Sequence, residues 1–206
     1  MRKIDYKKEL EHLYKPSPKQ AIIVDVPRMN FLMIDGEGDP NTSQTYQDAI
    51  EALFSVSYAL KFMIKRSELQ IDYGVLPLEG LWWTDDMSKF NAVNKDKWKW
   101  TSMVMQPEHV SKDFFETAVA QVKKKKKLIA LSDMRFESYN EGKAAQIMHI
   151  GPFSDEGPTI DRLHSFIRDN NYEPKGKHHE IYLSDFRKTA PDKLKTAIRQ
   201  PIKEKT

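Results

Sequence analysis

The stretch "QIMHIGPFSDEGPTIDRLHSFIRDNN", residues 146–171, joins two hydrophobic patterns. Its first residues are strand-like and end in Gly-Pro, a dipeptide typical of turns. The pattern after this turn predicts a helix, because apolar residues recur at helical spacing on one face: Ile160, Leu163, Phe166 and Ile167. A strand followed directly by a helix is therefore expected here.

Two more strand-like segments complete this part of the chain. They are "HHEIYLSD", residues 178–185, and "KTAIRQPI", residues 195–202, with a short helical turn expected at "APDKL" between them. Residues 144–202 therefore have the order strand, helix, strand, strand.

Residues 30–105 repeat this order. The predicted elements are a strand with a closing turn at 31–40, a helix at about 45–64, a strand at 77–83, a polar turn at 84–96 and a strand at 97–105. The identity between the two copies is slight, so the order of elements carries the inference of an internal duplication.

These patterns predict an α+β fold in which the whole chain, residues 1–206, is one domain built from two βαββ halves. The halves are expected at about residues 22–105 and 131–204, joined by a helix at about residues 111–126. If each helix covers one face of its strands, the uncovered faces form a groove between the halves. Such a junction is a usual place for a small-molecule pocket.

The composition excludes several function classes. With 39% hydrophobic and 31% charged residues, the chain is typical of a soluble globular protein, and its net charge of +3 is too weak to argue for nucleic-acid binding. The lysine run 123–127 is interpreted as a solvated helix end, with a nucleic-acid patch as the alternative. There is no cysteine, no apolar signal region and no run long enough to span a membrane. We expect a cytoplasmic protein; its oligomeric state cannot be predicted.

Glu180 lies in the middle of a predicted strand, where glutamate is uncommon. It shares one strand face with His178 and Tyr182, whereas Ile181 points to the opposite face, which we assign to the core under the helix. The residues alone favour a glutamate at the rim, in a surface ion pair. The alternative is a pocket carboxylate, whose pKa burial would raise so that it could serve as a general base near neutral pH.

The first half offers equivalent residues. Aligning "PLEGLWW" with "HHEIYLSD" sets Glu79 opposite the strand glutamate of the second half, with Leu81 and Trp83 on the same face. Trp98 and Trp100 alternate with lysines, so both are expected on one face of a neighbouring strand. Burial in the core is the alternative for each tryptophan.

The histidines do not predict a metal site. His149 ends a strand, where a structural hydrogen-bonding role is the alternative to ligand contact. His178 and His179 are adjacent, so they point to opposite faces of a strand and cannot bind one metal together. The glycines of "IDGEGDP" lack the spacing of a nucleotide-binding loop. We expect neither a metal nor a cofactor.

Three segments carry a resemblance to a known family: "VPRMNFLMIDGEGDPN" (26–41), "MHIGPFSDEGPTIDRL" (148–163) and "HHEIYLSDFRKTAPDKLKTAIRQPI" (178–202). They resemble the GyrI-like small-molecule-binding family, and its stand-alone branch more than its transcription regulators. The resemblance implies a pseudo-two-fold pair of βαββ units around an aromatic groove. It also implies a strand glutamate for cationic, lipophilic, aromatic ligands, and Glu180 is the matching position. No DNA-binding domain is expected, because the segment of about 20 residues before the first strand is too short for one.

Some stand-alone members that resemble this chain are cyclopropyl hydrolases, which open the cyclopropane of DNA-alkylating antibiotics of the yatakemycin and duocarmycin kind and so confer protection. In such a reaction Glu180 would activate water, with Tyr182 or Glu79 orienting it or supplying a proton. The expected ligand contacts are Leu81, Trp83, Trp98, Trp100, His149, Phe153 and His178. A non-catalytic drug-sequestering or sensing protein is the alternative, and a role in gyrase modulation is suggested only by the family's name.

Overall fold

The computed structural model describes residues 1–87 and 95–205, so most of the predicted polar turn at 84–96 lies outside the described residues. The helices are α1 Tyr6–Glu9, α2 Glu11–Tyr14, α3 Gln44–Arg66, α4 Lys112–Lys125 and α5 Gly157–Asp169. The strands are β1 Arg2–Ile4, β2 Ile22–Val26, β3 Met29–Glu37, β4 Ile71–Tyr73, β5 Leu78–Trp83, β6 Lys99–Gln106, β7 Arg135–Tyr139, β8 Gly142–Ile150, β9 Tyr172–Pro174, β10 His178–Tyr182 and β11 Lys195–Glu204. Short 3₁₀ turns lie at Lys95–Lys97, Ile129–Asp133, Phe153–Asp155 and Pro191–Lys193.

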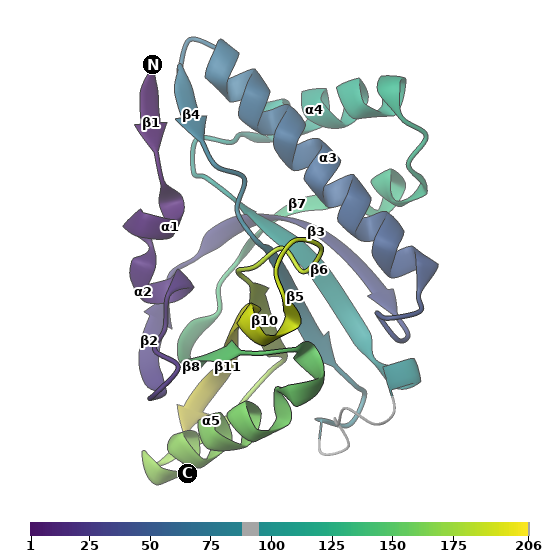
Figure 1. Cartoon of the computed structure of the whole chain (residues 1–206). Coiled ribbons are helices and arrows are strands. Elements are labelled where there is room, and N and C mark those ends of the chain that lie inside the picture. Colours follow the sequence, from purple (N-terminus) through teal and green to yellow (C-terminus); the bar gives the residue numbers. More distant parts are fainter. Residues whose placement is uncertain (88–94, 206) are drawn as a thin grey trace.

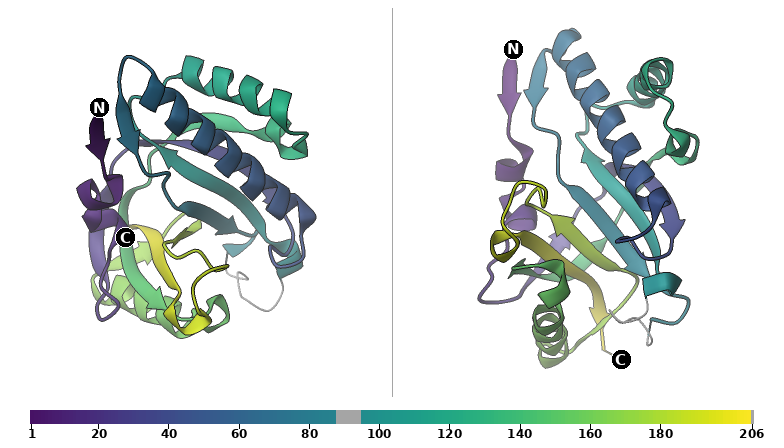
Figure 2. Two further views of the ribbon diagram at one scale, coloured as in Figure 1. Left: turned by 45° about the horizontal axis from the view of Figure 1, so that its top comes forward. Right: turned by 45° about the vertical axis from the view of Figure 1, so that its right-hand side comes forward.

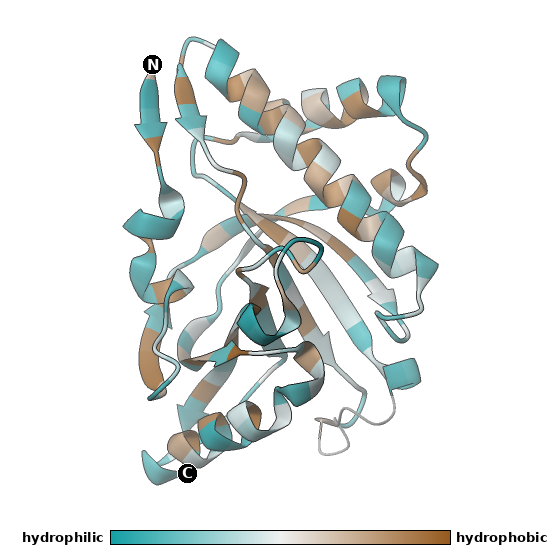
Figure 3. Ribbon diagram, in the orientation of Figure 1, coloured by the Kyte–Doolittle hydropathy of each residue, from teal (hydrophilic) through white to brown (hydrophobic). Residues whose placement is uncertain are grey.

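Two of the helices, α3 and α4, begin at a serine that caps them. Ser43 precedes α3 and its hydroxyl accepts a hydrogen bond from the backbone N–H of Tyr46 at 3.2 Å. Ser111 does the same for α4, accepting from Phe114 N at 3.3 Å. Hydrophobic and hydrophilic residues alternate around α3 and α5 in Figure 3, as expected for helices with one face on a sheet.

The order of strands in the main sheet shows the duplication. It reads β2-β8-β11-β10-β5-β6-β3-β7, with β9 paired to β11 at the side. From the outside inward, the second half contributes its first, last and middle strands, β8, β11 and β10. The first half contributes β3, β6 and β5 in the same sequence. The predicted α+β fold of two βαββ units is therefore confirmed, and the approximate two-fold passes between β10 and β5.

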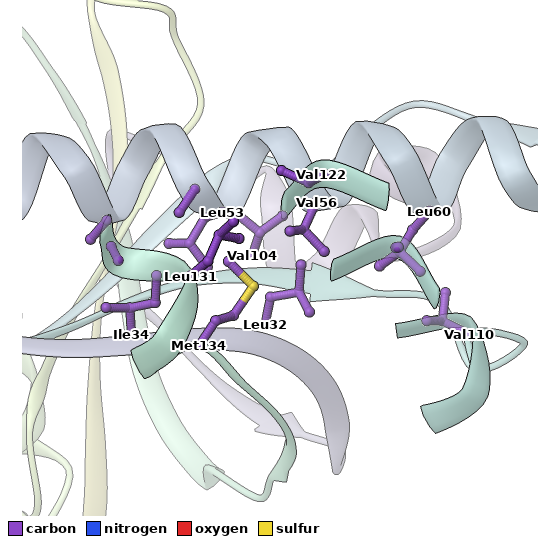
Figure 4. Close-up of a cluster of buried hydrophobic side chains, with 14 of the residues drawn as sticks. Leu32, Ile34, Leu53, Val56, Leu60, Val104, Val110, Val122, Leu131 and Met134 are labelled. Atoms are coloured by element: carbon purple, nitrogen blue, oxygen red, sulfur yellow. The ribbon is translucent and has the colours of Figure 1, made fainter. Parts of the chain in front are cut away.

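Helices α3 and α5 lie on the same face of the sheet (Figures 1 and 2). Leu53 and Leu60 of α3 pack in one cluster with Leu32 and Val104 of the sheet (Figure 4). Residues of α5 pack in a separate cluster on β8 and β11. Each helix thus covers the outer strands of its own half, and the central strands β5 and β10 run between them.

The opposite face of the sheet carries a second core without a long helix. Ile181 and Leu81 pack there with Met103 and with Leu13 and Tyr14 of the N-terminal segment. The prediction that the long helix covers the Ile181 face is therefore wrong. That face is closed by the curled sheet and by α1 and α2, which the sequence analysis did not predict. The groove instead lies on the helix-bearing face.

Candidate functional site

A groove of about 2160 Å³ lies over β5 and β10, between α3 and α5. Tyr46 of α3 and Ile160 of α5 line its opposite walls, and Trp82, Glu180 and Tyr182 line its floor. The volume exceeds the roughly 300–1,000 Å³ of a pocket for one drug-sized molecule. The walls are mostly apolar and aromatic, so the polar groups on the floor stand out as the candidate chemical centre.

The two-residue period of β10 places His178, Glu180 and Tyr182 on the groove face. Only 8% of Glu180 is exposed. Its Oε2 accepts a hydrogen bond from the Tyr182 hydroxyl at 2.7 Å, and its Oε1 accepts one from His178 Nε2 at 3.1 Å. Burial raises the pKa of the Glu180 carboxyl, but the hydrogen bonds from His178 and Tyr182 outweigh burial and lower it overall. Glu180 is thus a buried carboxylate held in its ionised form.

A second carboxyl, Glu156, lines the same groove and was not predicted. It lies in the turn just before α5, is 6% exposed, and its Oε1 has no hydrogen-bond partner among the described residues. Burial and the negative charge of Glu180 raise the pKa of Glu156 to about 9. At neutral pH the pair therefore holds one proton, which lies on Glu156. No periodic pattern points to this residue, because "SDEGP" has the composition of an ordinary turn.

Glu79 lies on the other face of the sheet, so its predicted equivalence to Glu180 is wrong. Across β5 and β10, Glu180 is opposite Gly80 and Ile181 is opposite Glu79. Residues directly opposite in an antiparallel pair point the same way, and neighbours along a strand point oppositely. Glu79 therefore shares the face of Ile181.

On that face Glu79 belongs to a buried network of charges. It accepts hydrogen bonds from the Tyr14 hydroxyl at 2.8 Å and from His179 Nε2 at 3.0 Å. His179 Nδ1 donates to Glu141 at 2.9 Å, and Glu141 also accepts from Arg199 at 3.1 Å. Every charge in this network has an opposite partner, which is how buried ionic groups are retained in proteins. The network ties the N-terminal segment to the sheet.

The tryptophans, like the two glutamates, are divided between the two faces of the sheet. Leu81 and Trp83, predicted as ligand contacts, lie on the Glu79 face, where the Lys177 ammonium is 3.3 Å from the centre of the Trp83 ring. Trp82, which was not singled out, is on the groove floor. Trp98 lines the groove. Trp100 shares the groove face but is 1% exposed, packed edge-on against Tyr46.

His149 and Phe153 flank the turn that carries Glu156. His149 Nε2 donates to the Pro152 carbonyl at 3.1 Å, and His149 Nδ1 therefore accepts from the Thr159 hydroxyl at 3.0 Å. These bonds give His149 a structural role, joining the end of β8 to the start of α5. Phe153 lines the groove and meets the Tyr182 ring edge-on at 5.6 Å between centres.

Within residues 1–87 and 95–205, no three histidine, aspartate or glutamate side chains are grouped as a metal site would require. None of the helices in the same ranges is long and apolar enough to cross a membrane.

The model of the GyrI-like small-molecule binding domain matches residues 19–203. Among solved structures, a hydrolase from Listeria innocua is 38% identical, with a TM-score of 0.88 over 98% of this chain and 100% of that chain. An uncharacterized conserved protein from the same organism is 39% identical, with a TM-score of 0.89 over 97% and 100%. The EcmrR C-terminal domain, 12% identical, has the same fold with a TM-score of 0.55 over 90% and 98%. No curated protein matches the chain.

Proposed function

Because this chain belongs to the GyrI-like small-molecule-binding family, we propose that it hydrolyses the cyclopropane ring of flat, lipophilic aromatic electrophiles of the yatakemycin and duocarmycin kind. The observation that carries this proposal is the carboxyl pair on the groove floor. Glu180 is ionised, whereas Glu156 beside it keeps its proton to a pH of about 9, its pKa. The similarity to a protein named a hydrolase over 98% of the chain supports a reaction rather than binding alone.

The two carboxyls suit the two proton transfers of this reaction. Water attacks the exposed cyclopropane carbon while Glu180 accepts a proton from the water. The bond from that carbon to the ring breaks, its electron pair moves into the conjugated dienone, and Glu156 donates a proton to the dienone oxygen, which becomes a phenol. The product contains one added water. Transfer of the proton from Glu180 back to Glu156 restores the resting state.

The groove also suits the substrate class. The rings of Trp98 and Phe153 line the same groove as the carboxyl pair and offer faces and edges for a flat aromatic ligand. Burial of the pair in an apolar groove strengthens its electrostatic effect on the charge that develops at the dienone oxygen. Glu156 replaces Glu79 as the expected partner of Glu180, because Glu79 faces away from the groove.

The test is incubation with a cyclopropane-bearing alkylator in ¹⁸O-labelled water, followed by mass spectrometry. We expect the wild type to form a product heavier by one labelled water. The control variant Glu173→Gln should form it too, because Glu173 makes a partly exposed surface ion pair with Lys203. Glu156→Gln and Glu180→Gln should each lower the rate at which this product forms. An absence of the labelled product with the folded wild type would contradict the proposal.

A non-catalytic drug-binding role is the second candidate, favoured by the size of the groove and by the ionised Glu180. An ionised carboxylate among aromatic rings attracts lipophilic cations. In that case Glu180→Gln should weaken the binding of cationic dyes and spare neutral ones, with no turnover in the wild type.

A further inference from the structure

Trp82 is linked to Glu180 by two hydrogen bonds that share the Tyr182 hydroxyl. Its indole Nε1 donates a hydrogen bond to the Tyr182 hydroxyl oxygen at 3.1 Å, and that hydroxyl donates to Glu180 Oε2 at 2.7 Å. An indole N–H can only donate, so the Tyr182 oxygen must act as its acceptor. The Tyr182 proton is therefore directed away from Trp82, toward Glu180. The chain of hydrogen bonds has a single direction.

The indole holds this position because Gly80 leaves room for it. A Cβ atom on Gly80 would lie 2.7 Å from Trp82 Nε1 and 2.9 Å from the adjacent ring carbon. Glycine in a strand often marks such a close approach. The rest of the indole is closely packed, since Trp82 is 2% exposed and its ring packs against Tyr46 and Trp98, at 5.7 and 5.4 Å between centres.

We infer that Trp82, seated over Gly80, is a positioning residue that fixes the direction of the Tyr182 hydrogen bond and thereby keeps Glu180 the proton-accepting member of the carboxyl pair. The Tyr182 hydroxyl donates to Glu180 and so stabilises its ionised form. The proton of the pair then remains on Glu156. This inference rests on the proposed function for its catalytic consequence, but the proton distribution can be measured without turnover.

Several other charged or titratable groups surround Glu180. They are His178 and Tyr182 on its own strand, Tyr46 from α3, Glu156 from the turn before α5, and Lys95 from the 3₁₀ turn before β6. His164 of α5 interacts electrostatically with His178, which in turn contacts Glu180. All of them remain in a Trp82 variant, so a changed titration in that variant reports the lost indole.

The test is an infrared titration of the carboxyl groups in the unliganded protein, assigned with Glu156→Gln and Glu180→Gln. In Trp82→Phe, the Tyr182 hydroxyl can rotate, so Glu180 should take up its proton at a pH higher by roughly 0.5–1 unit, the equivalent of one net hydrogen bond. The acid side of the pH–rate profile should move by the same amount. An unchanged titration in folded Trp82→Phe would overturn the inference, whether or not the protein proves to be a hydrolase.

Two further variants separate positioning from general damage. Gly80→Ala should displace the indole and reproduce the shift, whereas Gly74→Ala should not, because a Cβ on Gly74 meets no atom within 4 Å. In a Tyr182→Phe background the Trp82→Phe substitution should have no additional effect on the Glu180 titration, because the hydroxyl that links Trp82 to Glu180 is absent. A shift that persists in that background would assign the effect of Trp82 to packing alone and overturn the inference.

Discussion

Glu79 and Glu180 lie on neighbouring strands one residue out of step, and their carboxyl groups point to opposite faces of the sheet. Glu180 faces the groove, where Tyr182 and His178 hold it ionised. Glu79 faces a closed core, where Tyr14 and His179 hold it. Two glutamates that look alike in the sequence therefore have different environments, and the same substitution should have different effects at the two positions.

Glu180→Gln preserves the shape of the side chain but cannot accept a proton. We expect hydrolysis to fall by about 10²–10⁴-fold, with little change in the binding of a neutral substrate analogue. Glu79→Gln should lower the free energy of unfolding by about 1–3 kcal/mol, because it weakens a buried ionic contact, and change the rate much less. Steady-state kinetics and urea unfolding of both variants test this, and a larger rate loss in Glu79→Gln would contradict the assignment.

Glu156→Gln should stabilise the protein at neutral and alkaline pH. The pKa of Glu156 is raised by burial and by Glu180 from 4.5 to about 9 on folding. The stabilising contribution of this group is therefore complete below about pH 4.5 and is lost as the pH rises through about 9. Glutamine does not titrate, so the variant should unfold at a higher temperature from pH 7 to 9, by the equivalent of about 1–3 kcal/mol. Thermal unfolding across pH, with Glu173→Gln as control, should show no such gain in the control.

In the buried network around His179, in contrast to Glu156, replacing a carboxylate by a neutral side chain should destabilise the protein. Burial lowers the pKa of His179, but the carboxylates of Glu141 and Glu79 outweigh it and raise the pKa from 6.5 to about 9. Its contribution to stability is therefore complete below about pH 6.5 and is lost as the pH rises through about 9. Glu141→Gln removes one partner of two buried cations and should cost about 3–5 kcal/mol in urea unfolding. Glu11→Gln, which breaks an exposed pair with Lys15, should leave the free energy of unfolding nearly unchanged.

Trp98 and Trp83 provide a matched test of the groove. Trp98 lines it, and Trp83 is on the opposite face. Trp98→Phe should weaken the binding of a flat aromatic ligand by about 0.5–1.5 kcal/mol, whereas Trp83→Phe should leave the affinity unchanged. Calorimetric titration of one ligand into both variants measures this. Equal losses in the two variants would show that the ligand occupies another surface.

The order of elements and the place of Glu180 on a strand could be predicted from the sequence. Helical periodicity identified α3 and α5. These features depend on residues close together in the chain, so local physics determines them. A glutamate directly before Ile181 and Tyr182, together with the resemblance of whole segments, pointed to the carboxylate on β10.

Which face of the sheet each side chain lies on depends on tertiary structure. In β5 a shift of one residue exchanges Trp82 for Trp83, and it removes Glu79 from the groove, because side chains alternate with a period of two. No local pattern fixes that register when both faces of a strand are buried. The role of Glu156 was equally hidden, since a turn residue acquires a pKa of about 9 only where folding buries it beside Glu180. Local sequence patterns determine which elements form, whereas the long-range pairing of β5 with β10 determines which charged side chains lie together.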